Sequence, residues 1–325
     1  MFAIENKQII VQKKNIYCSF PDIIKSKKTK NKLFLVYREG NSHHPTWSKL
    51  VFLVSTNNGE TWKMKKEFHL NIERNGCVWN CPRLSYIDNI LCIICDKKSS
   101  TYERTAQFST SILSSISEGK FFNYINVPFP GMVPDKIIKF KNKLYCANHK
   151  IKSPKNDLIQ LVNWSRDNGK LWYDTSIVAN DSIRQYCEGS IVNIDDKYLI
   201  AYLRDNSGHQ RSIYYTKSED GTNWSEPEAL GDVVGQRVTA IKDNNIIIGA
   251  YRNTKEVKVS LFYHPIDKEQ EIKIFDIDEE YSDNLYHFGY TGIAKIDDNR
   301  FLVVYYIRNE FSNPVIKTAI IKRIN

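Results

Sequence analysis

The sequence predicts an all-β protein, a six-bladed β-propeller with four-stranded antiparallel blades, and three observations predict it. Short runs rich in Ile, Val, Tyr and Phe alternate with turns of Asn, Asp, Gly and Lys, and helical periodicity is almost absent. An outline of two apolar strands joined by a polar turn returns six times along the 325 residues. A second motif, a tight polar turn ending in Trp, follows three of these hairpins. Self-similarity of this kind identifies a repeat architecture.

The six copies of the hairpin begin at positions 20, 81, 133, 187, 236 and 289. They read FPDIIKSKKTKNKLFLVYRE, CPRLSYIDNILCIICDKK, VPDKIIKFKNKLYCANHK, CEGSIVNIDDKYLIAYLRD, QRVTAIKDNNIIIGAYRN and GYTGIAKIDDNRFLVVYYI. Each turn carries Asn or Asp, which tight turns favour. Units of about fifty residues hold four strands with their turns, and six of them close into a ring with only short strand edges.

Closure of the ring requires one blade built from both ends of the chain. The last hairpin is followed by NPVIKTAIIKRIN, and the early segment AIENKQIIVQ can supply the missing outer strand of that blade. We therefore expect the N- and C-terminal strands to close the ring, and residues 1–325 to form a single propeller domain.

The turn motif reads STNNGETW from Ser55, SRDNGKLW from Ser165 and SEDGTNW from Ser218. It follows the pattern Ser-x-Asp-x-Gly-x-Thr-Trp, with Asn57 at the Asp position of the first copy and one residue fewer in the third. A short polar side chain bonds the turn backbone, Gly supplies a positive φ and Trp packs between blades. These three turn motifs are expected to be structural, and to lie at the end of the propeller opposite the starts of the inner strands.

The charge and the cysteines restrict the partners. The net charge of +9, from 46 Lys and Arg against 37 Asp and Glu, favours acidic partners. No nucleic-acid motif appears, and no run approaches a membrane span, so neither partner is expected. The absence of a signal peptide and the seven Cys predict a cytoplasmic protein with reduced thiols, or export by another route. Cys92 and Cys95 lie three apart in a predicted strand and point to opposite faces, so we expect no metal there.

Three turn motifs of this type on a six-fold repeat resemble the sialidase superfamily, whose turns of this kind are called Asp boxes. The resemblance covers nearly the whole chain and implies a site at one end of the propeller axis. The repeat places polar or ionisable side chains at that end. The starts of the inner strands bring Asp22, Arg83, Asp135, Glu188, Arg237 and Tyr290, and the ends of the second strands bring Arg38, Asp96, His149, Arg204, Arg252 and Tyr306.

Four residues match the family pattern. Glu188 is similar to the catalytic Glu of the family, and Tyr290 to its Tyr nucleophile. Arg204 and Arg252 resemble two members of its carboxylate-binding Arg triad, since a guanidinium fork suits a carboxylate. A Tyr nucleophile is reasonable for a substrate with a carboxylate on its anomeric carbon, because a carboxylate nucleophile would be repelled.

Two departures from the family pattern concern the first blade. The Arg-Ile-Pro motif of the family is replaced by Ser19-Phe20-Pro21, so a triad Arg is missing unless Arg38 or Arg237 fills the gap. The loop that carries the general-acid Asp in the family reads EGNSHHPTW and holds none. Asp22, His43 or His44 is the expected acid, and His suits this role near neutral pH.

The sequence and the resemblance together predict an exo-acting glycoside hydrolase of sialidase type that needs no cofactor. Its expected substrate is a glycan or glycoconjugate ending in an acidic sugar: a sialic acid, another nonulosonic acid or Kdo. The predicted catalytic residues are Tyr290, Glu188, Asp22, His43 and His44, and the predicted substrate-binding residues are Arg38, Arg204, Arg237, Arg252, Asp135 and Arg83. Two alternatives stay open: a non-catalytic glycan-binding propeller, and a lyase that uses Tyr290 with His43 or His44 on a uronic acid.

Overall fold

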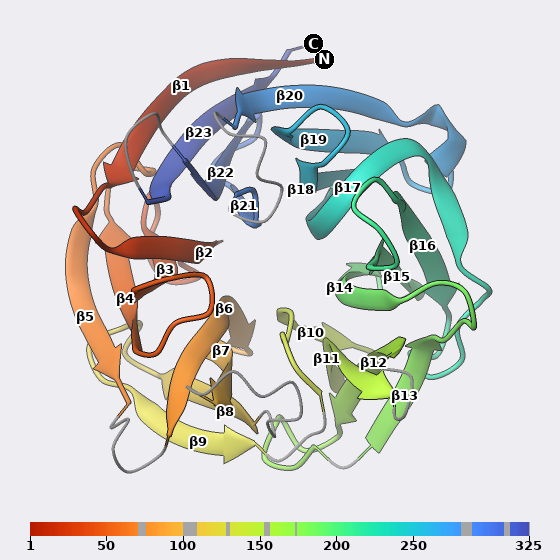
Figure 1. Cartoon of the computed structure of the whole chain (residues 1–325), viewed down its shortest axis with the longest axis horizontal. Coiled ribbons are helices and arrows are strands. Elements are labelled where there is room, and N and C mark those ends of the chain that lie inside the picture. The colour runs from red at the N-terminus through yellow and green to blue at the C-terminus, as the bar shows by residue number, and fades with distance from the viewer. Residues whose placement is uncertain are drawn as a thin grey trace.

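The computed structural model describes residues 1–70, 76–99, 109–127, 131–152, 157–172, 174–280, 288–308 and 313–324. The described residues form strands β1 to β23 and one short 3-10 helix, η1 (Glu269–Glu271). No helix in these ranges is long and apolar enough to cross a membrane. The strands form blades around a central axis, with the first strand of each blade nearest the centre (Figure 1).

Blades 1, 2 and 3 are separate four-stranded antiparallel sheets. From the inner to the outer strand, blade 1 consists of β2 (Tyr17–Lys25), β3 (Leu33–Gly40), β4 (Ser48–Ser55) and β5 (Lys63–His69). Blade 2 consists of β6 (Cys77–Ile87), β7 (Ile90–Ser99), β8 (Ser109–Ser115) and β9 (Asn123–Val127). Blade 3 consists of β10 (Ile137–Phe140), β11 (Lys143–Lys152), β12 (Asp157–Ser165) and β13 (Asp174–Ala179).

Blades 4 and 5 share one long strand, β17 (Glu228–Asp243), whose first half pairs with β16 and whose second half pairs with β18. Blade 4 begins with β14 (Tyr186–Ile194), β15 (Tyr198–Asp205) and β16 (Ser212–Ser218), and blade 5 continues with β18 (Ile246–Asn253), β19 (Lys258–Pro265) and β20 (Lys273–Glu279). Blade 6 consists of β21 (Thr291–Lys295), β22 (Arg300–Ile307), β23 (Val315–Arg323) and β1 (Phe2–Val11). The prediction that both ends of the chain share a blade is confirmed, since β1 pairs with β23 (Figure 1).

The apolar core of the described residues is divided among the interfaces between neighbouring blades. Six clusters of buried side chains occur, one for each pair of adjacent blades. The cluster between blades 6 and 1 joins Leu33 and Leu35 to Leu302 and Val304, all fully buried. Burial of apolar surface at this interface holds the last blade against the first and stabilises the ring.

The Asp boxes lie at the end of the strands opposite the starts of the inner strands, as predicted. In each of the three, the Ser hydroxyl accepts a hydrogen bond from the Gly amide at 2.8 to 3.0 Å. A fourth box, which the sequence analysis missed, connects β8 to β9: Gly119 donates to Ser115 Oγ at 2.8 Å, and Ser117 replaces the Asp. We call this end of the axis the box end and the other the site end.

The first strand of each blade bulges where it reaches the site end. The register shifts by one residue between Ser19 and Asp22 in blade 1, and at the matching place in blades 2, 4 and 5. One residue in each of the six blades has a positive φ there: Phe20, Cys81, Val133, Glu188, Arg237 and Gly289. Five of the six are not Gly, and this conformation is costly for them. A bulge re-aims side chains, and such strain is concentrated at functional sites.

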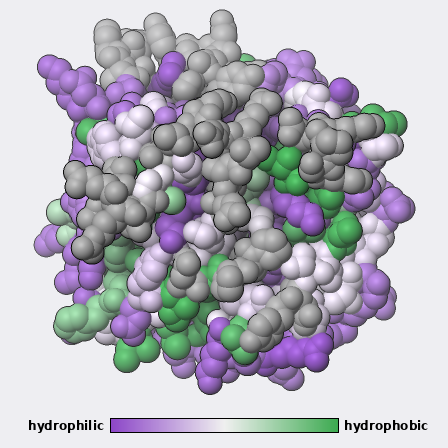
Figure 2. All heavy atoms as spheres, turned by 60° about the horizontal axis from the view of Figure 1, so that its bottom comes forward, coloured by the Kyte–Doolittle hydropathy of each residue, from purple (hydrophilic) through white to green (hydrophobic). Residues whose placement is uncertain are grey.

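Cys92 and Cys95 lie in β7, and their side chains enter different interfaces, with blades 3 and 1 respectively. The predicted opposite orientation of the pair is therefore confirmed. On the face turned forward in Figure 2, the described residues show only small hydrophobic patches among hydrophilic side chains. Exposed large apolar residues include Ile4, Met64 and Ile177, which lie in different blades. Scattered exposure of this kind is ordinary.

Candidate active site

The site end of the axis collects the ends of the second strands, as the repeat predicted. Arg38, Arg204 and Arg252 each pair with the residue that precedes a bulge. His149 bridges Met132 at the matching place in blade 3. In blade 6, Tyr306 accepts the amide of Gly289 at 2.7 Å.

The predicted equivalence of the residues at the starts of the inner strands is wrong by one or two positions. The true counterparts of Glu188 and Arg237 are Phe20, Cys81, Val133 and Gly289, which share the positive φ. Asp22, Arg83 and Asp135 stand two residues further along, in register with Ser190, Thr239 and Thr291. The hairpin copies that begin at 187 and 236 start one residue before the positive-φ position, whereas the other four start on it. Residues from two different rings were therefore treated as one ring.

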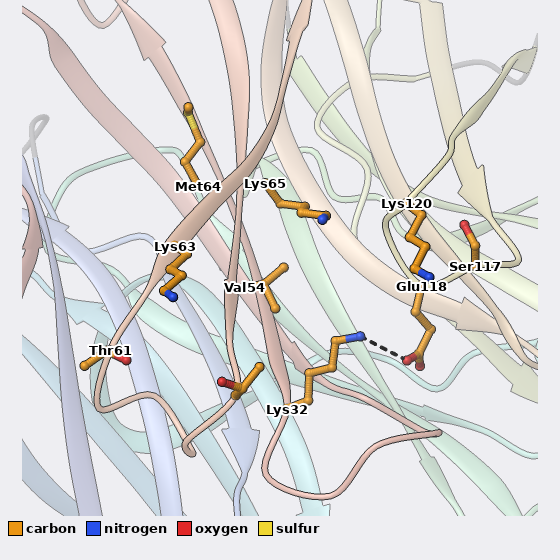
Figure 3. A pocket seen from close by; sticks show the side chains of 10 residues that line it. Lys32, Val54, Thr61, Lys63, Met64, Lys65, Ser117, Glu118 and Lys120 are labelled. Carbon is orange, nitrogen blue, oxygen red and sulfur yellow. Dashed lines mark ion pairs between the residues drawn. The ribbon is translucent and has the colours of Figure 1, made fainter.

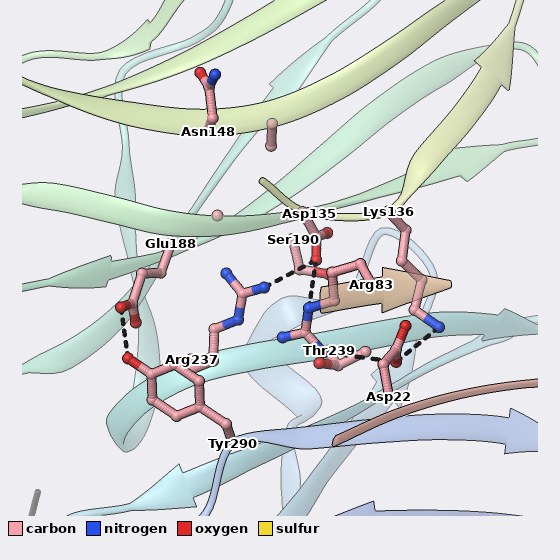
Figure 4. Close-up of polar contacts among 12 residues, drawn as sticks. Asp22, Arg83, Asp135, Lys136, Asn148, Glu188, Ser190, Arg237, Thr239 and Tyr290 are labelled. Atoms are coloured by element: carbon pink, nitrogen blue, oxygen red, sulfur yellow. Dashed lines mark hydrogen bonds and ion pairs between the residues drawn. The ribbon is translucent and has the colours of Figure 1, made fainter. Parts of the chain in front are cut away.

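Tyr290 and Glu188 are in direct contact, although they lie in blades 6 and 4. The Tyr290 hydroxyl donates to Glu188 Oε1 at 2.5 Å. Arg204 Nη1 donates to Glu188 Oε2 at 2.9 Å and to the Tyr290 oxygen at 3.2 Å. The three side chains form a closed triangle of hydrogen bonds, and all three are largely buried (Figure 4 shows the Tyr290–Glu188 bond).

The electrostatics of the triangle keep Glu188 ionised. Burial alone would raise the pKa of Glu188, but the charges of Arg204 and Arg237, together with the bond from Tyr290, outweigh it and hold that pKa well below its usual range. His149 lies beside the pair, and its Nδ1 accepts the Glu188 amide at 3.4 Å. Burial lowers the pKa of His149 to about 4, so this ring is neutral at neutral pH.

Tyr290 is protonated in this resting arrangement. Burial, followed by the negative charge of Glu188, raises the pKa of the Tyr290 phenol well above its usual value, although Arg204 and Arg252 oppose this effect. A protonated phenol that donates to an ionised carboxylate can pass its proton to that carboxylate, which is the arrangement that activation of a nucleophile by a base requires. The short bond gives the proton a direct path from oxygen to oxygen.

Two further arginines pack against the ring of Tyr290. The Arg252 Cζ lies 4.7 Å from the ring centroid and the Arg237 Cζ lies 5.8 Å from it. Arg252 approaches this closely because blade 6 has Gly289 at its bulge, where a Cβ atom would meet the Arg252 Cβ at 3.0 Å. Arg204 and Arg252 therefore both contact Tyr290.

Asp22, Arg83 and Asp135 are buried side chains that contact one another. Arg83 reaches Asp22 at 3.5 Å and Asp135 at 3.6 Å, and Lys136 reaches Asp22 at 3.0 Å (Figure 4). Asp22 also accepts the amide of Leu84 at 2.7 Å. A carboxylate that is fully buried and lies between two cations is poorly placed to protonate a leaving group, so the geometry is unfavourable for Asp22 as the acid.

Arg38 is occupied by the loop that follows β3. Its guanidinium donates to Ser19 Oγ and Asn80 Oδ1, both at 3.2 Å, and to the carbonyl oxygens of Ser42 at 3.2 Å and His43 at 3.0 Å. The ring of Phe20 packs against the guanidinium, with its centroid 4.5 Å from Cζ. Arg38 is fully buried in this position, so its guanidinium orders the loop.

The two histidines of that loop differ in their surroundings. His43 Nδ1 lies 3.2 Å from the Tyr17 hydroxyl, and its ring centroid is 5.5 Å from that of Phe20. The Phe20 centroid is in turn 5.1 Å from that of Tyr290. His44 is exposed, and its Nδ1 lies 3.2 Å from the Lys98 ammonium nitrogen. His43 is therefore the histidine nearer to the triangle.

Comparisons with known proteins identify the fold. A family model for a BNR repeat-like domain matches residues 123–268, and no curated protein sequence matches the chain. A structure of unknown function from Dyadobacter fermentans matches with a TM-score of 0.84 at 18% identity, over 99% of both chains. The NanB sialidase of Streptococcus pneumoniae matches with a TM-score of 0.74 at 12% identity, over 97% of this chain and 70% of its own. Leech intramolecular trans-sialidase matches with a TM-score of 0.73 at 12% identity, over 98% of this chain and 70% of its own.

The chain is a propeller with the fold of these sialidases, and the BNR repeat-like family model matches part of it, residues 123–268. Several site contacts of this propeller had no signal in the sequence. Phe20 reaches Tyr290 only because of its bulge, and Asn206 accepts from Arg204 Nη2 at 2.5 Å from a loop position without a repeat counterpart. Gln236 accepts from Arg252 Nη1 at 2.9 Å, one residue before the bulge. Only the position of Gln236 opposite Arg252 in the predicted hairpin could have indicated this contact.

A concavity of about 270 Å³ lies at the box end between blades 1 and 2 (Figure 3). Val54 and Met64 contribute its apolar walls, and Lys32 forms an ion pair with Glu118 at 3.6 Å. The other lysines that line it are Lys63, Lys65 and Lys120. Because it opens beside the Asp boxes, this concavity is separate from the candidate active site.

Proposed function

We propose that the protein is an exo-acting glycoside hydrolase of sialidase type that releases a terminal acidic sugar. The observation that carries this proposal is the triangle of Tyr290, Glu188 and Arg204 on the propeller axis. A phenol is a poor nucleophile at neutral pH unless a base takes its proton, and here an ionised carboxylate lies within hydrogen-bond distance. The similarity to the sialidases named above supports the same assignment.

The reaction would pass through a covalent glycosyl-enzyme. The Tyr290 proton moves to Glu188, the phenolic oxygen forms a bond to the anomeric carbon, and the bond from that carbon to the leaving oxygen breaks. An acid delivers a proton to the leaving oxygen. Water then attacks the anomeric carbon and gives one proton to the conjugate base of that acid, the bond to Tyr290 breaks, and the phenol recovers its proton from Glu188. No step requires a metal or an organic cofactor.

The substrate carboxylate would lie against Arg252 and Arg204. A guanidinium has five N–H groups. Arg252 donates to the Phe288 carbonyl, Gln236 and Tyr306, which leaves two of the five for a ligand. A carboxylate next to Tyr290 would also neutralise part of the positive charge that the two arginines and Arg237 concentrate there.

The test of this proposal is turnover of aryl glycosides of several acidic sugars, with binding of the free sugars measured in parallel. We expect release of the aryl alcohol from at least one of them. Binding without turnover would favour the glycan-binding propeller instead. An unsaturated uronic acid, detected by its ultraviolet absorbance, would favour the lyase.

The pH dependence should identify the acid. Burial, followed by the charge of Arg38, lowers the pKa of His43 well below 6.5. An acid must be protonated, so turnover of alkyl glycosides should be highest in mildly acidic solution. It should fall as the pH rises through the pKa of His43, before neutrality is reached. Glu188 must be ionised, and its depressed pKa leaves it so in mild acid. Aryl glycosides leave without protonation and should not show this decline.

The matched variants are His43→Gln and His44→Gln, which remove one ring each from the same loop. His43→Gln should slow alkyl glycosides and abolish the decline, with little change for aryl glycosides. His44→Gln should resemble the wild type, because the His44 ring is exposed and lies beside Lys98. The reverse pattern would assign the acid to His44, and an unchanged profile in both would exclude the pair.

A further inference from the structure

Arg237 is a fully buried arginine whose hydrogen bonding is incomplete. Its Nε and Nη1 groups have no hydrogen-bond partner among the described residues. It also has a positive φ of 49°, which costs energy for a residue with a side chain. A buried cation with unpaired N–H groups is expensive, and features of this kind are retained at functional sites.

The position of Arg237 is fixed from the channel side. Its Nη2 lies 3.4 Å from Asp135 Oδ1, and Asp135 is shared with Arg83 at 3.6 Å. Arg83 in turn contacts Asp22, which contacts Lys136. Because the single negative charge of Asp135 is shared by Arg83 and Arg237, it does not fully neutralise Arg237. Part of the positive charge of Arg237 therefore remains to act on the groups on its opposite side.

On that other side lie Glu188 and Tyr290. Figure 4 shows the Arg237 guanidinium between Glu188 and Asp135, with the ring of Tyr290 next to it. Moving the phenolic proton to Glu188 transfers one negative charge from the carboxylate to the tyrosine oxygen. Arg204 contacts both oxygens directly, whereas Arg237 lies near both without being bonded to either.

We propose that Arg237 is a positioning residue whose fixed, uncancelled charge keeps Glu188 ionised as the base and stabilises the negative charge that passes to Tyr290. The role in catalysis rests on the proposed function, whereas the effect on Glu188 does not. The charged groups that face Glu188 are Arg204 from β15 and Arg237 itself from β17. The other titratable groups around it are His149 from β11, Tyr290, Cys81 from β6, Cys187 from β14 and Tyr306 from β22. Since His149 is neutral at neutral pH, Arg204 and Arg237 are the two cations of this environment.

The experiment follows the Glu188 carboxyl by NMR in protein labelled with ¹³C-glutamate, with the signal assigned by Glu188→Gln. In the wild type we expect the carboxyl to stay ionised down to the lowest pH at which the protein is folded. In Arg237→Met it should begin to protonate within the folded range, about one pH unit or more higher. Arg237→Lys keeps the charge and should resemble the wild type. Arg237→Gln is the second neutral variant if Arg237→Met does not fold.

Lys136→Met is the matched control, because it removes a cation from the opposite end of the same ionic chain. It should leave the Glu188 titration unchanged. An unchanged titration in the neutral Arg237 variants would overturn the proposal, and so would an equal shift in Lys136→Met. This readout needs no turnover, so it remains decisive if the protein proves not to be a hydrolase.

If the protein turns over glycosides, the neutral Arg237 variants should lower kcat about 10-fold or more with little change in KM. The acidic limb of the pH profile should move to higher pH, because Glu188 would then protonate more readily. Arg237→Lys should restore most of kcat. A loss confined to KM would instead make Arg237 a substrate ligand and would contradict the proposal.

Discussion

Replacing Tyr290 by Phe should reduce turnover by about 10³-fold or more while the sugar still binds. Only the reacting oxygen is removed. The ring remains packed against Phe20, with centroids 5.1 Å apart, and Arg252 remains over its face at 4.7 Å. The measurements are kcat and KM on an aryl glycoside of the acidic sugar, and calorimetric binding of the free sugar to both proteins.

A matched control comes from the neighbouring tyrosine pair in β22. The Tyr305 hydroxyl donates to Asp278 Oδ2 at 2.9 Å, so it is also a phenol bonded to a carboxylate, but it lies in the interface between blades 5 and 6. Tyr305→Phe should cost about 1.5–3 kcal/mol of stability, because its hydroxyl bonds to a charged group, and leave kcat unchanged. Equal turnover of Tyr290→Phe and wild type would rule out this nucleophile. Equal losses in both variants would indicate a general effect on folding.

The fold could be predicted from the sequence because its signal is repeated. Six hairpins and three Asp boxes report the same unit, so an irregular copy does not obscure it. The fourth box escaped notice because Ser117 replaces the Asp and Phe122 stands where the others have Trp. Its turn nonetheless forms, since the Ser115 hydroxyl and Gly119 at φ 93° supply the essential contacts.

The site could be predicted only where the resemblance fixed individual residues. Tyr290 and Glu188 were paired by similarity to a family, and the structure brings them together at 2.5 Å. Asp22, Arg83 and Asp135 follow the positive-φ residue of their blades by two positions, so they belong to a different ring from Glu188 and Arg237. The sequence contains a clue to the right alignment. The first three copies have Pro at the position of Tyr290, namely Pro21, Pro82 and Pro134.

Arg38 shows a different limit of the sequence. Its position at the end of β3 was predicted correctly, but side-chain direction depends on partners that no repeat specifies. The guanidinium donates hydrogen bonds to Asn80 and to two loop carbonyl groups, and the ring of Phe20 packs over it. The sequence therefore predicted more arginines for ligand binding than the structure leaves available, because Arg38 is bonded within the protein.

Replacing Arg252 by Met should remove the preference for an acidic sugar. We expect kcat/KM on the acidic aryl glycoside to fall about 100-fold, since hydrogen bonds to charged groups contribute about 1.5–3 kcal/mol each. The same variant should turn over the carboxyl-reduced glycoside, in which an alcohol replaces the carboxylate, about as slowly as the wild type does. The quantity that decides is the ratio of the two rates, because a general loss of activity would cancel in it.

Two comparisons separate this direct contact from long-range attraction by a protein of net charge +9. Arg300→Met removes the same charge at the box end, where Arg300 pairs with Asp297 at 2.7 Å. It should leave the ratio unchanged, and any small effect should vanish as salt is added, because exposed charges are screened. The loss in Arg252→Met should persist in salt, since this guanidinium is buried beside Tyr290 and its contact with a bound carboxylate would exclude water. A salt-sensitive loss of equal size in both variants would mean that Arg252 acts only through its charge, and the carboxylate would then have to bind elsewhere.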